Sequence, residues 1–502
     1  MNRDSRWDVL VAGAGPTGLV LALWLTRLGV RVRIVDKTDG VATTSRALVV
    51  HARTLEFYQQ LGIAEDAVAR GRKFAGVQLW SHGAVRGQVV LGDIGADLSP
   101  FPYMLILPQD VHERLLVDAL DAAGVAVERG TELAAFIATD DAIFATLRRR
   151  DGMEESCVTS YLAGCDGAHS TVRHGMGVGF AGDAYAHLFY VADVKAGGAV
   201  MNGDLNLALD TSDFLAVFPL PGEGNARLIG TIERGSEDEQ RALRWDDVSR
   251  GVLDHLPLEI HNINWFSTYH VHHRVAARFR AGRAFLLGDA AHIHSPVGGQ
   301  GMNTGIGDAV NLAWKLALVI EGRADDRLLD TYESERIAFA RRLVATTDRA
   351  FTFVTRDGSI ARVVREDVAP RVIPELLHAE VARRFLFKTV SQIEIEYRDS
   401  ALSIGKAGRT HGGDRLPWMG INFEPLQSLQ WQAHVYGEAS DALVALSREL
   451  ALALHVFPGS RDAGLPADTL LLVRPDGYIA LADPAADPAR LRSYFGARGL
   501  AL

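Results

Sequence analysis

The segment Gly282-Arg-Ala-Phe-Leu-Leu-Gly-Asp289-Ala-Ala-His-Ile-His-Ser-Pro296-Val-Gly298-Gly-Gln-Gly301-Met302-Asn303 carries the clearest structural signal in this chain. It joins a short apolar strand to an acid, which we expect to be buried, and then to a glycine-rich turn before a helix. Bare glycine backbone lets a ligand approach closely, and the first amides of the helix stabilise negative charge. The segment predicts a flavin site in which Asp289 accepts hydrogen bonds from the ribityl chain of FAD.

A second motif, near the N-terminus, predicts the same cofactor. A strand runs into a GxGxxG turn and a helix, and the next strand ends in an acid, Asp36. This order is the fingerprint of a dinucleotide-binding fold, in which glycines admit the pyrophosphate to the helix end and the acid binds ribose hydroxyls. The residues that this motif assigns to FAD are Gly13, Gly15, Pro16, Thr17, Gly18, Asp36 and Lys37.

Three motifs in order resemble those of the FAD-dependent aromatic hydroxylases, single-component flavoprotein monooxygenases of the para-hydroxybenzoate hydroxylase type. They are Gly13-x-Gly15-x-x-Gly18, then Cys165-Asp166-Gly167-Ala-His-Ser170-Thr-Val-Arg173, and then Gly288-Asp289 with Pro296 and Gly298-Gly-Gln-Gly301. The motifs cover about the first two-thirds of the chain. The last hundred or so residues resemble the thioredoxin-like tail of the phenol hydroxylase and polyketide hydroxylase branch.

The resemblance implies an α/β fold with a Rossmann-like FAD-binding domain, an inserted antiparallel β-sheet substrate domain and a C-terminal thioredoxin-like α/β domain. The alternating strand patterns between residues 205 and 232 favour the inserted sheet, and residues 405–413 are predicted to be a turn-rich linker. The expected domains are 1–75, 101–180 and 270–390 for FAD binding with a helical extension, 76–100 and 181–269 for the substrate, and 400–502 for the tail.

The resemblance also assigns roles to single residues. Asp166 is expected to touch the flavin pyrophosphate region and the path used by the pyridine nucleotide. Arg46 is expected near the pyrophosphate, and Gln109, at a helix start, on the ribityl side. Around the isoalloxazine ring we expect Pro296, which we also take as catalytic, together with Gly298, Gly301, Met302 and Asn303.

The activity implied by the resemblance is an NAD(P)H- and O2-dependent monooxygenase that hydroxylates a phenolic or polycyclic aromatic substrate through a C4a-hydroperoxyflavin. FAD would be tightly bound. NADH or NADPH would bind transiently, because no second GxGxxG follows a strand. The alternatives are a flavoprotein that binds an aromatic ligand without hydroxylating it, and a flavin halogenase. A halogenase would need a lysine in a Trp-rich motif, whereas Lys73 has no tryptophan after it until Trp80.

The substrate site is less clear in the sequence. The candidate wall residues are Leu48, Phe214, Phe218, Pro219 and Val297. Phenol hydroxylase relatives carry an acid just before the segment matching Arg53-Thr-Leu-Glu56, but no carboxylate stands at that place here. His51 is the nearest titratable group and the first candidate for a catalytic base near neutral pH. The alternative is that His51 packs against or caps the following helix.

Composition limits the class of protein. The 502 residues are 48% hydrophobic, which suffices for two or three domains, and two cysteines give no disulfide framework. The net charge of −10 argues against a nucleic-acid partner. No uninterrupted apolar run is long enough to cross a bilayer, so no membrane span is expected. We therefore expect a cytoplasmic enzyme whose partners are an aromatic small molecule and O2, and which could form a homodimer.

A group of histidines, His270, His272 and His273 with His292 and His294, invites a metal interpretation. No cysteine or carboxylate completes an obvious ligand set, and flavin needs no metal for its oxygen chemistry. We therefore expect no metal, and place these histidines at a seam between domains.

Overall fold

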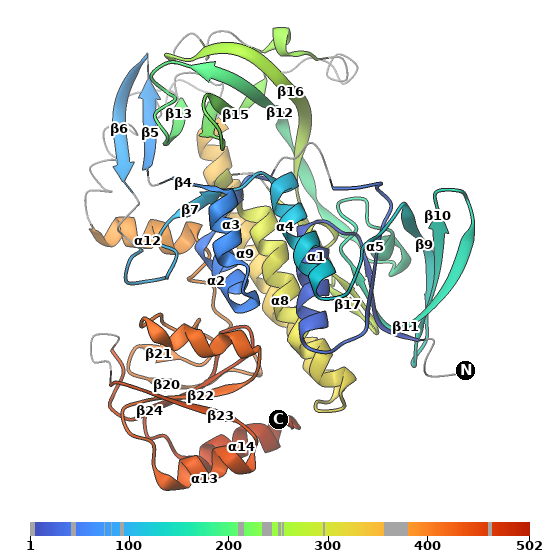
Figure 1. The fold of residues 1–502 in the computed structure, drawn as a ribbon, viewed down its shortest axis with the longest axis vertical. Helices are drawn as coiled ribbons and strands as arrows, with labels where there is room; N and C mark the ends of the chain where they lie inside the picture. The colour runs from blue at the N-terminus through green and yellow to red at the C-terminus, as the bar shows by residue number, and fades with distance from the viewer. Residues whose placement is uncertain are drawn as a thin grey trace.

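The computed structural model describes residues 6–41, 47–74, 76–81, 83–90, 95–208, 215–232, 243–248, 253, 256–294, 297–355, 380–459 and 464–501. The predicted mixed α/β fold is confirmed. Figure 1 shows a central region of long helices, a curved sheet at one end, antiparallel except for the β13–β5 pair, and a smaller α/β unit at the other end.

The central sheet sets the site. Its main path runs β17 (Arg280–Ala281), β18 (Ala284–Leu286), β11 (Glu154–Gly164), β1 (Trp7–Ala12), β2 (Val32–Asp36) and β8 (Glu128–Arg129), while β10 (Ile143–Arg149) and β9 (Thr131–Ala138) extend from β11. Strand β1 is parallel to both β2 and β11, and β11 is parallel to β18. Near the edge where they end, these four strands bury apolar residues, among them Val9–Ala12, Ile34, Val35, Leu162, Ala163 and Ala284–Leu286.

Helices cover this sheet. The N-terminal ones are α1 (Pro16–Arg27), α2 (Ala52–Leu61), α3 (Ala64–Arg70) and α4 (Gln109–Ala122), followed by the single turn α5 (Thr171–Gly175) and the longer α8 (Gln300–Ile320) and α9 (Asp330–Thr355). Helix α8 runs through the middle of the molecule (Figure 1) and is buried along most of its length. No described helix is both long and apolar enough to cross a bilayer.

The second sheet is the curved one in Figure 1. Its order is β19 (His292–Ile293), β16 (Glu259–Ala276), β12 (Phe180–Gly197), β15 (Asn225–Ile232), β14 (Leu215–Pro219), β13 (Leu205–Ala208), β5 (Gly76–Ser81) and β6 (Ala84–Val90). A three-stranded sheet of β3 (Val49–Val50), β7 (Met104–Ile106) and β4 (Arg72–Phe74) lies between it and the helices.

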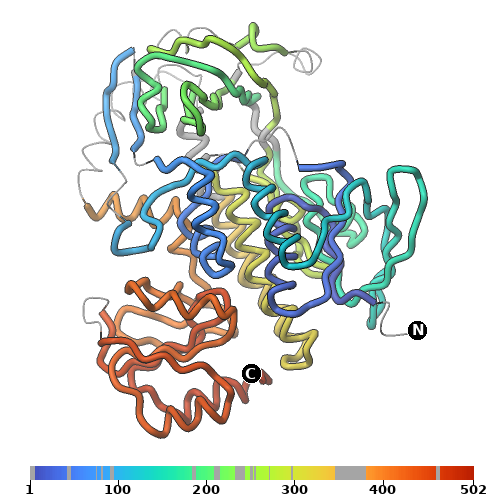
Figure 2. The backbone as a smooth tube through the Cα atoms, in the orientation of Figure 1, coloured from blue at the N-terminus to red at the C-terminus, as the bar shows by residue number. Residues whose placement is uncertain are grey.

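The tail forms the third unit, which the tube in Figure 2 shows at the far end from the curved sheet. After α12 (Glu380–Val390), its sheet runs β21 (Thr410–His411), β20 (Ile404–Ala407), β25 (Ile479–Asp483), β24 (Thr469–Val473), β22 (Gln432–Tyr436) and β23 (Ala453–Phe457), with helices α13 (Asp441–Glu449) and α14 (Pro488–Arg498).

The predicted linker at residues 405–413 is wrong, because this segment forms the β20–β21 hairpin at the edge of the tail sheet. Gly405 has φ +83°, and a Cβ there would lie 2.2 Å from the carbonyl oxygen of Ala482. Here glycine serves close strand pairing rather than a loose connection.

Candidate FAD site

The three motifs meet at one edge of the central sheet. Ala12 is in register with Gly164, and Gly164 with Leu286, so three neighbouring parallel strands end side by side. The Cys165 amide donates to the Ala12 carbonyl over 2.8 Å, which extends this alignment into the turns. Ligands of open α/β sheets bind outside the carboxyl ends of the strands. The motifs therefore converge where such a ligand would sit.

The glycine turn after β1 leaves a gap that the protein does not fill. A Cβ on Gly13 would lie 2.3 Å from the Cys165 carbonyl oxygen, and one on Gly18 would lie 2.0 Å from the Gly13 carbonyl oxygen. By contrast, no atom lies within 4 Å of a Cβ built on Gly15, the N-cap of α1. This open place at a helix N-terminus fits a phosphate group.

Asp36 supports the same turn. Its Oδ2 accepts a hydrogen bond from the Ala14 amide over 2.7 Å, and its Oδ1 accepts one from the Thr38 amide over 2.8 Å. Arg129 approaches the carboxylate at 3.7 Å. Lys37, beside it, is exposed. Asp36 thus fixes the glycine turn to the end of β2.

Helices α1 and α8 approach closely beside this turn. A Cβ on Gly305 would lie 2.3 Å from the Thr17 Oγ1 atom, and one on Gly288 would lie 2.8 Å from the same atom. Thr17, in the N-terminal motif, therefore packs against the motif at Gly288 from the second half of the chain. Both glycines are needed because no side chain fits there.

Asp289 differs from the expectation of a buried acid, because its side chain is exposed. It lies in the single 3-10 turn Gly288–Ala290, in which Gly288 and Ala290 are buried and Asp289 is at the surface. The buried acid of this region is Asp308 of α8, which accepts from the Gly288 amide over 3.0 Å.

Asp308 was not identified from the sequence. Burial acts to raise the pKa of this carboxyl, but Arg336 and His292 hold the pKa below its usual value. Arg336 Nε donates to Asp308 over 2.6 Å, and the His292 ring contacts it at 2.7 Å. An acid inside an otherwise apolar stretch of helix was the available signal. Asp308 fixes the turn at Gly288 and leaves Asp289 facing outward.

The Asp166 segment joins the same edge. Asp166 Oδ2 accepts from the Val172 amide over 3.1 Å, whereas its buried Oδ1 has no partner among the described residues. Burial raises the pKa of this carboxyl. Arg173 donates to the carbonyls of Ala290 and Ala168 over 3.0 and 2.8 Å, which ties this segment to the turn at Gly288. The unsatisfied oxygen is available to a donor group on a ligand.

The glycine turn before α8 is held by two side chains. Gly298 and Gly299 have φ of +77° and +63°. The Gly299 carbonyl accepts from His51 Nε2 over 3.0 Å and from Asn303 Nδ2 over 2.8 Å. Asn303 Oδ1 accepts from the His51 amide over 3.0 Å. This turn, whose backbone only glycine adopts easily, is therefore fixed to the start of α2.

His51 is fully buried, and burial lowers its pKa to about 4. Its Nε2 donates to a carbonyl, which leaves Nδ1 as an acceptor without a partner among the described residues. The imidazole is thus neutral at pH 7. Any proton that His51 exchanges would titrate near pH 4 and not in the range of pH 6–7 that an ordinary histidine suggests.

This low pKa predicts an acid dependence of stability. The folded pKa lies below the unfolded value of about 6.5, so the contribution of neutral His51 is complete above that pH and is lost as pH falls towards 4. On going from pH 7.5 to pH 5, we expect the His51→Gln variant to lose about 2 kcal/mol less stability than the wild type. Denaturant unfolding at both pH values measures the difference. His174→Gln, at an exposed position, should behave like the wild type.

The remaining predicted residues fall into three groups. Leu48 and Phe218 belong to one apolar cluster, with Val49, Phe74, Ile106 and Leu220, where the curved sheet meets the β3–β7–β4 sheet, and Pro219 is buried beside it. Gln109 begins α4 and donates to Glu113 over 2.6 Å, while Met302 packs against the central core. Arg46, Phe214 and Pro296 lie outside the described residues, as does the side chain of Val297.

Among the described residues no group of three or more potential ligands could hold a metal ion.

The chain is similar to known proteins in both sequence and fold. The family described as FAD binding domain matches residues 6–347. The chain is 36% identical to 6-methylpretetramide 4-monooxygenase of Streptomyces rimosus over 94% of this chain and 90% of that protein. It is 30% identical to pentachlorophenol 4-monooxygenase of Sphingobium chlorophenolicum over 82% and 75%. The solved anhydrotetracycline hydroxylase of Streptomyces rimosus matches with a TM-score of 0.78 and 29% identity over 99% of this chain and 100% of that one.

Proposed function

The chain belongs to the FAD-binding family of aromatic and polyketide monooxygenases, and on this premise we propose that it hydroxylates a phenolic or polycyclic aromatic substrate with O2 and NADH or NADPH. One observation carries the flavin assignment: three motifs from distant parts of the chain end at one sheet edge, beside the open space at Gly15. Bound FAD would supply hydride acceptance and the activation of O2 for transfer to the ring.

The residues present suit FAD. We assign the pyrophosphate to Gly13, Gly15 and the first turn of α1. The adenosine ribose is assigned to Asp36 and the ribityl chain to Asp289. The turn held by His51 and Asn303 would lie against the ring. In the same arrangement, the contacts of Arg46, Gln109, Pro296 and Met302 with FAD remain predictions from the resemblance.

The Asp289 assignment predicts a measurable loss of affinity. Because a charged acceptor of hydroxyl hydrogen bonds contributes about 1.5–3 kcal/mol, Asp289→Ala should weaken FAD binding about ten- to hundredfold. Fluorescence titration of the apoprotein measures the dissociation constant. Asp121→Ala, which removes an exposed acid at the end of α4, is the matched control and should bind FAD normally. Equal affinity in Asp289→Ala would remove the ribityl assignment.

The chain's own residues shape the substrate side. Leu48 and Phe218 lie in one apolar cluster between the two sheets, and we propose that this cluster and Pro219 form part of a dry wall for the aromatic rings. The names of the relatives that act on 6-methylpretetramide and anhydrotetracycline support a polycyclic phenol. No carboxylate stands at residues 47–50, so the phenol proton would go to His51 Nδ1 or leave an already acidic phenol.

For the tail we propose the thioredoxin-like architecture implied by the resemblance. A sheet of mixed direction with α13 and α14 supports it. The only cysteines, Cys157 and Cys165, lie upstream, so the tail has no dithiol chemistry. The proposed domains remain those predicted from the sequence, with β5 and β6 joining the curved substrate sheet.

The deciding experiment separates the proposed activity from its two alternatives. Purified protein loaded with FAD is screened with phenols and polycyclic phenols for stimulated NAD(P)H oxidation, and the products are analysed by mass spectrometry. A gain of one oxygen atom supports hydroxylation. Ligand binding without turnover would identify a non-catalytic flavoprotein, and a halogenated product in the presence of halide would identify a halogenase. Against the last, Lys73 of β4 lies over the Tyr103 ring at 4.3 Å, in no Trp-rich motif.

A further inference from the structure

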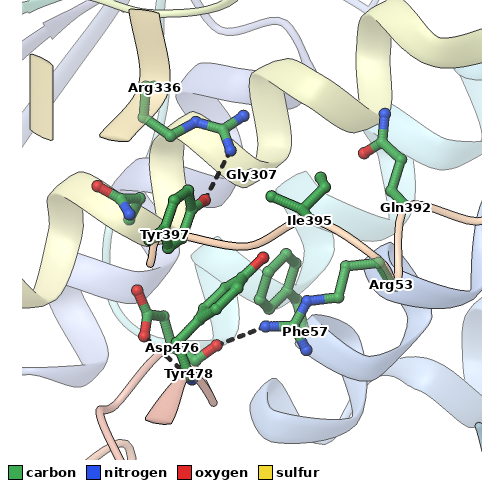
Figure 3. A pocket seen from close by; sticks show the side chains of 10 residues that line it. Arg53, Phe57, Gly307, Arg336, Gln392, Ile395, Tyr397, Asp476 and Tyr478 are labelled. Atoms are coloured by element: carbon green, nitrogen blue, oxygen red, sulfur yellow. Dashed lines mark hydrogen bonds between the residues drawn. The ribbon is translucent and has the colours of Figure 1, made fainter. Parts of the chain in front are cut away.

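The turn between β24 and β25, residues 474–478, contacts three helices of the FAD-binding region, and Figure 3 shows its contact with Arg53 of α2. Arg474 binds Glu335 of α9 with Nη–Oε distances of 2.8 and 3.0 Å. The Asp476 carboxylate accepts from Trp314 Nε1 of α8 over 3.0 Å. Its backbone carbonyl accepts from Arg53 Nη2 of α2 over 2.6 Å. This tail segment, the 474–478 turn, is therefore bound to α2, α8 and α9 together.

Two residues of α2 bind this turn: Gln60, whose Nε2 donates to the Pro475 carbonyl over 2.9 Å, and Arg53 near the start of the helix. The Arg53 side chain is only 3% exposed, and its Nη1 donates to Glu56 Oε2 over 2.8 Å. The guanidinium lies 4.2 Å from the centre of the Phe57 ring and 4.9 Å from that of Tyr478. A buried arginine held by a carboxylate, a carbonyl and two rings has a fixed position.

Arg53 is linked to the proposed flavin turn through His51. It is the second residue of α2, and His51, two positions earlier, donates to the Gly299 carbonyl. The Arg53 amide donates in turn to the Ser391 carbonyl over 3.2 Å. A displacement of Arg53 would thus move the first turn of α2, and with it the His51 ring that supports Gly299.

The seam between α2 and the tail leaves a small space beside Arg53. This space is lined by residues of α2, α8, α9 and the tail, among them Phe57, Tyr397 and Tyr478 (Figure 3). The polar contacts of Arg53 therefore act together with those of Gln60 and of Glu56 with Arg415 in holding α2 against the tail.

We propose that Arg53 is a positioning residue through which the 474–478 turn fixes His51 and the Gly298–Gly299 turn in the place that seats the flavin ring. The inference rests on the proposed flavin site. It gives the tail a role in cofactor geometry although the tail contributes no residue to the predicted FAD contacts.

The test compares two buried arginines that share one carboxylate. Arg415 of the tail also binds Glu56, with Nε at 2.9 Å and Nη2 at 2.5 Å, and its side chain is 7% exposed. Its remaining side-chain hydrogen bond goes to the Leu98 carbonyl, so within the described residues its guanidinium is bonded outside the 474–478 turn. Arg53→Met and Arg415→Met therefore remove the same kind of charge from the same seam. Full-length variants are examined by thermal unfolding, FAD titration and visible circular dichroism of the bound flavin.

We expect both variants to unfold at lower temperature. Only Arg53→Met should change the visible dichroism of FAD and raise its dissociation constant at least tenfold. Arg53→Lys keeps a charge for Glu56 but cannot span both partners, so it should show the same flavin changes with a smaller loss of stability, and it serves if Arg53→Met does not fold. Identical flavin properties in the Arg53 and Arg415 variants would overturn the inference alone. Wild-type protein that binds no FAD would overturn the proposed function as well.

Discussion

The Gly15→Ala variant should fold as the wild type does and bind FAD at least about a hundredfold more weakly, a loss of about 2.7 kcal/mol. No protein atom lies within 4 Å of the new Cβ, and the φ of −74° at Gly15 is open to alanine. The methyl group would instead occupy the space that we assign to the pyrophosphate. Titration of apoprotein with FAD, beside thermal unfolding without FAD, measures both quantities.

The control for this change is Gly496→Ala in α14, where an added Cβ also meets no atom within 4 Å. That variant should keep the FAD affinity, and its unfolding temperature should stay the same or rise, because alanine favours a helix more than glycine does. If Gly15→Ala binds FAD as tightly as Gly496→Ala does, the pyrophosphate does not lie at the start of α1.

The Glu335→Gln variant should lose about 3–5 kcal/mol of stability, the usual effect of removing one partner from a buried ion pair. The Glu335 side chain is fully buried and contacts Lys315 at 2.8 Å and Arg474 at 2.8 Å, with Ser400 Oγ donating over 2.6 Å. Glutamine keeps the shape but leaves two buried cations with less negative charge. Chemical denaturation monitored separately for the tail and the flavin measures the loss.

Glu449→Gln is the matched substitution at the surface, where the ion pair with Arg492 is more than half exposed on both sides. It should change stability little, because water screens such pairs. Burial acts to raise the pKa of Glu335, but Arg474 and Lys315 hold it well below the ordinary value. Its contribution is therefore complete above about pH 4.3 and decreases as pH falls below that value, so the wild type should lose more stability in strong acid than Glu335→Gln does.

Local patterns account for the elements that the sequence predicted well. Strand β2 ends at Asp36, as expected of the strand that follows the glycine turn, and α4 begins at Gln109, the residue expected at a helix start. A glycine, an acid or a proline bounds each of these elements. Such residues act on the backbone within a few positions, so the boundaries can be predicted from the sequence alone.

Three features could not be predicted from the sequence because they depend on contacts between distant residues. The ion pair of Glu335 with Arg474 spans 139 positions, and neither residue stands in a recognisable motif. The exposure of Asp289 follows from Asp308 in the next long helix, whose carboxylate takes the buried place. Likewise, the pKa of His51 is set by its burial beneath the Gly299 carbonyl, which only the assembled turn provides.

In the candidate site, the positions that exclude any side chain were the easiest to predict, because only glycine can occupy them. Gly13 and Gly18 cannot carry a side chain in this fold, and both were assigned from spacing alone. The substrate wall was predicted less well, because apolar residues such as Leu48 serve equally in a core. The structure shows only that Leu48 and Phe218 belong to one cluster.

The side-by-side ends of β1, β11 and β18 bear on how the protein is made. During synthesis the N-terminal glycine turn leaves the ribosome early, yet Leu286, at the end of β18, follows only in the second half of the chain. The bond from Arg53 to Asp476 closes a still longer separation, of 423 positions. Because nascent chains emerge from the N-terminus, the first strands lack a partner and need protection from aggregation until β18 has emerged, and the contact with the tail forms only after residue 476. A stalled or truncated product would therefore hold every glycine of the first motif and still lack a finished cofactor pocket.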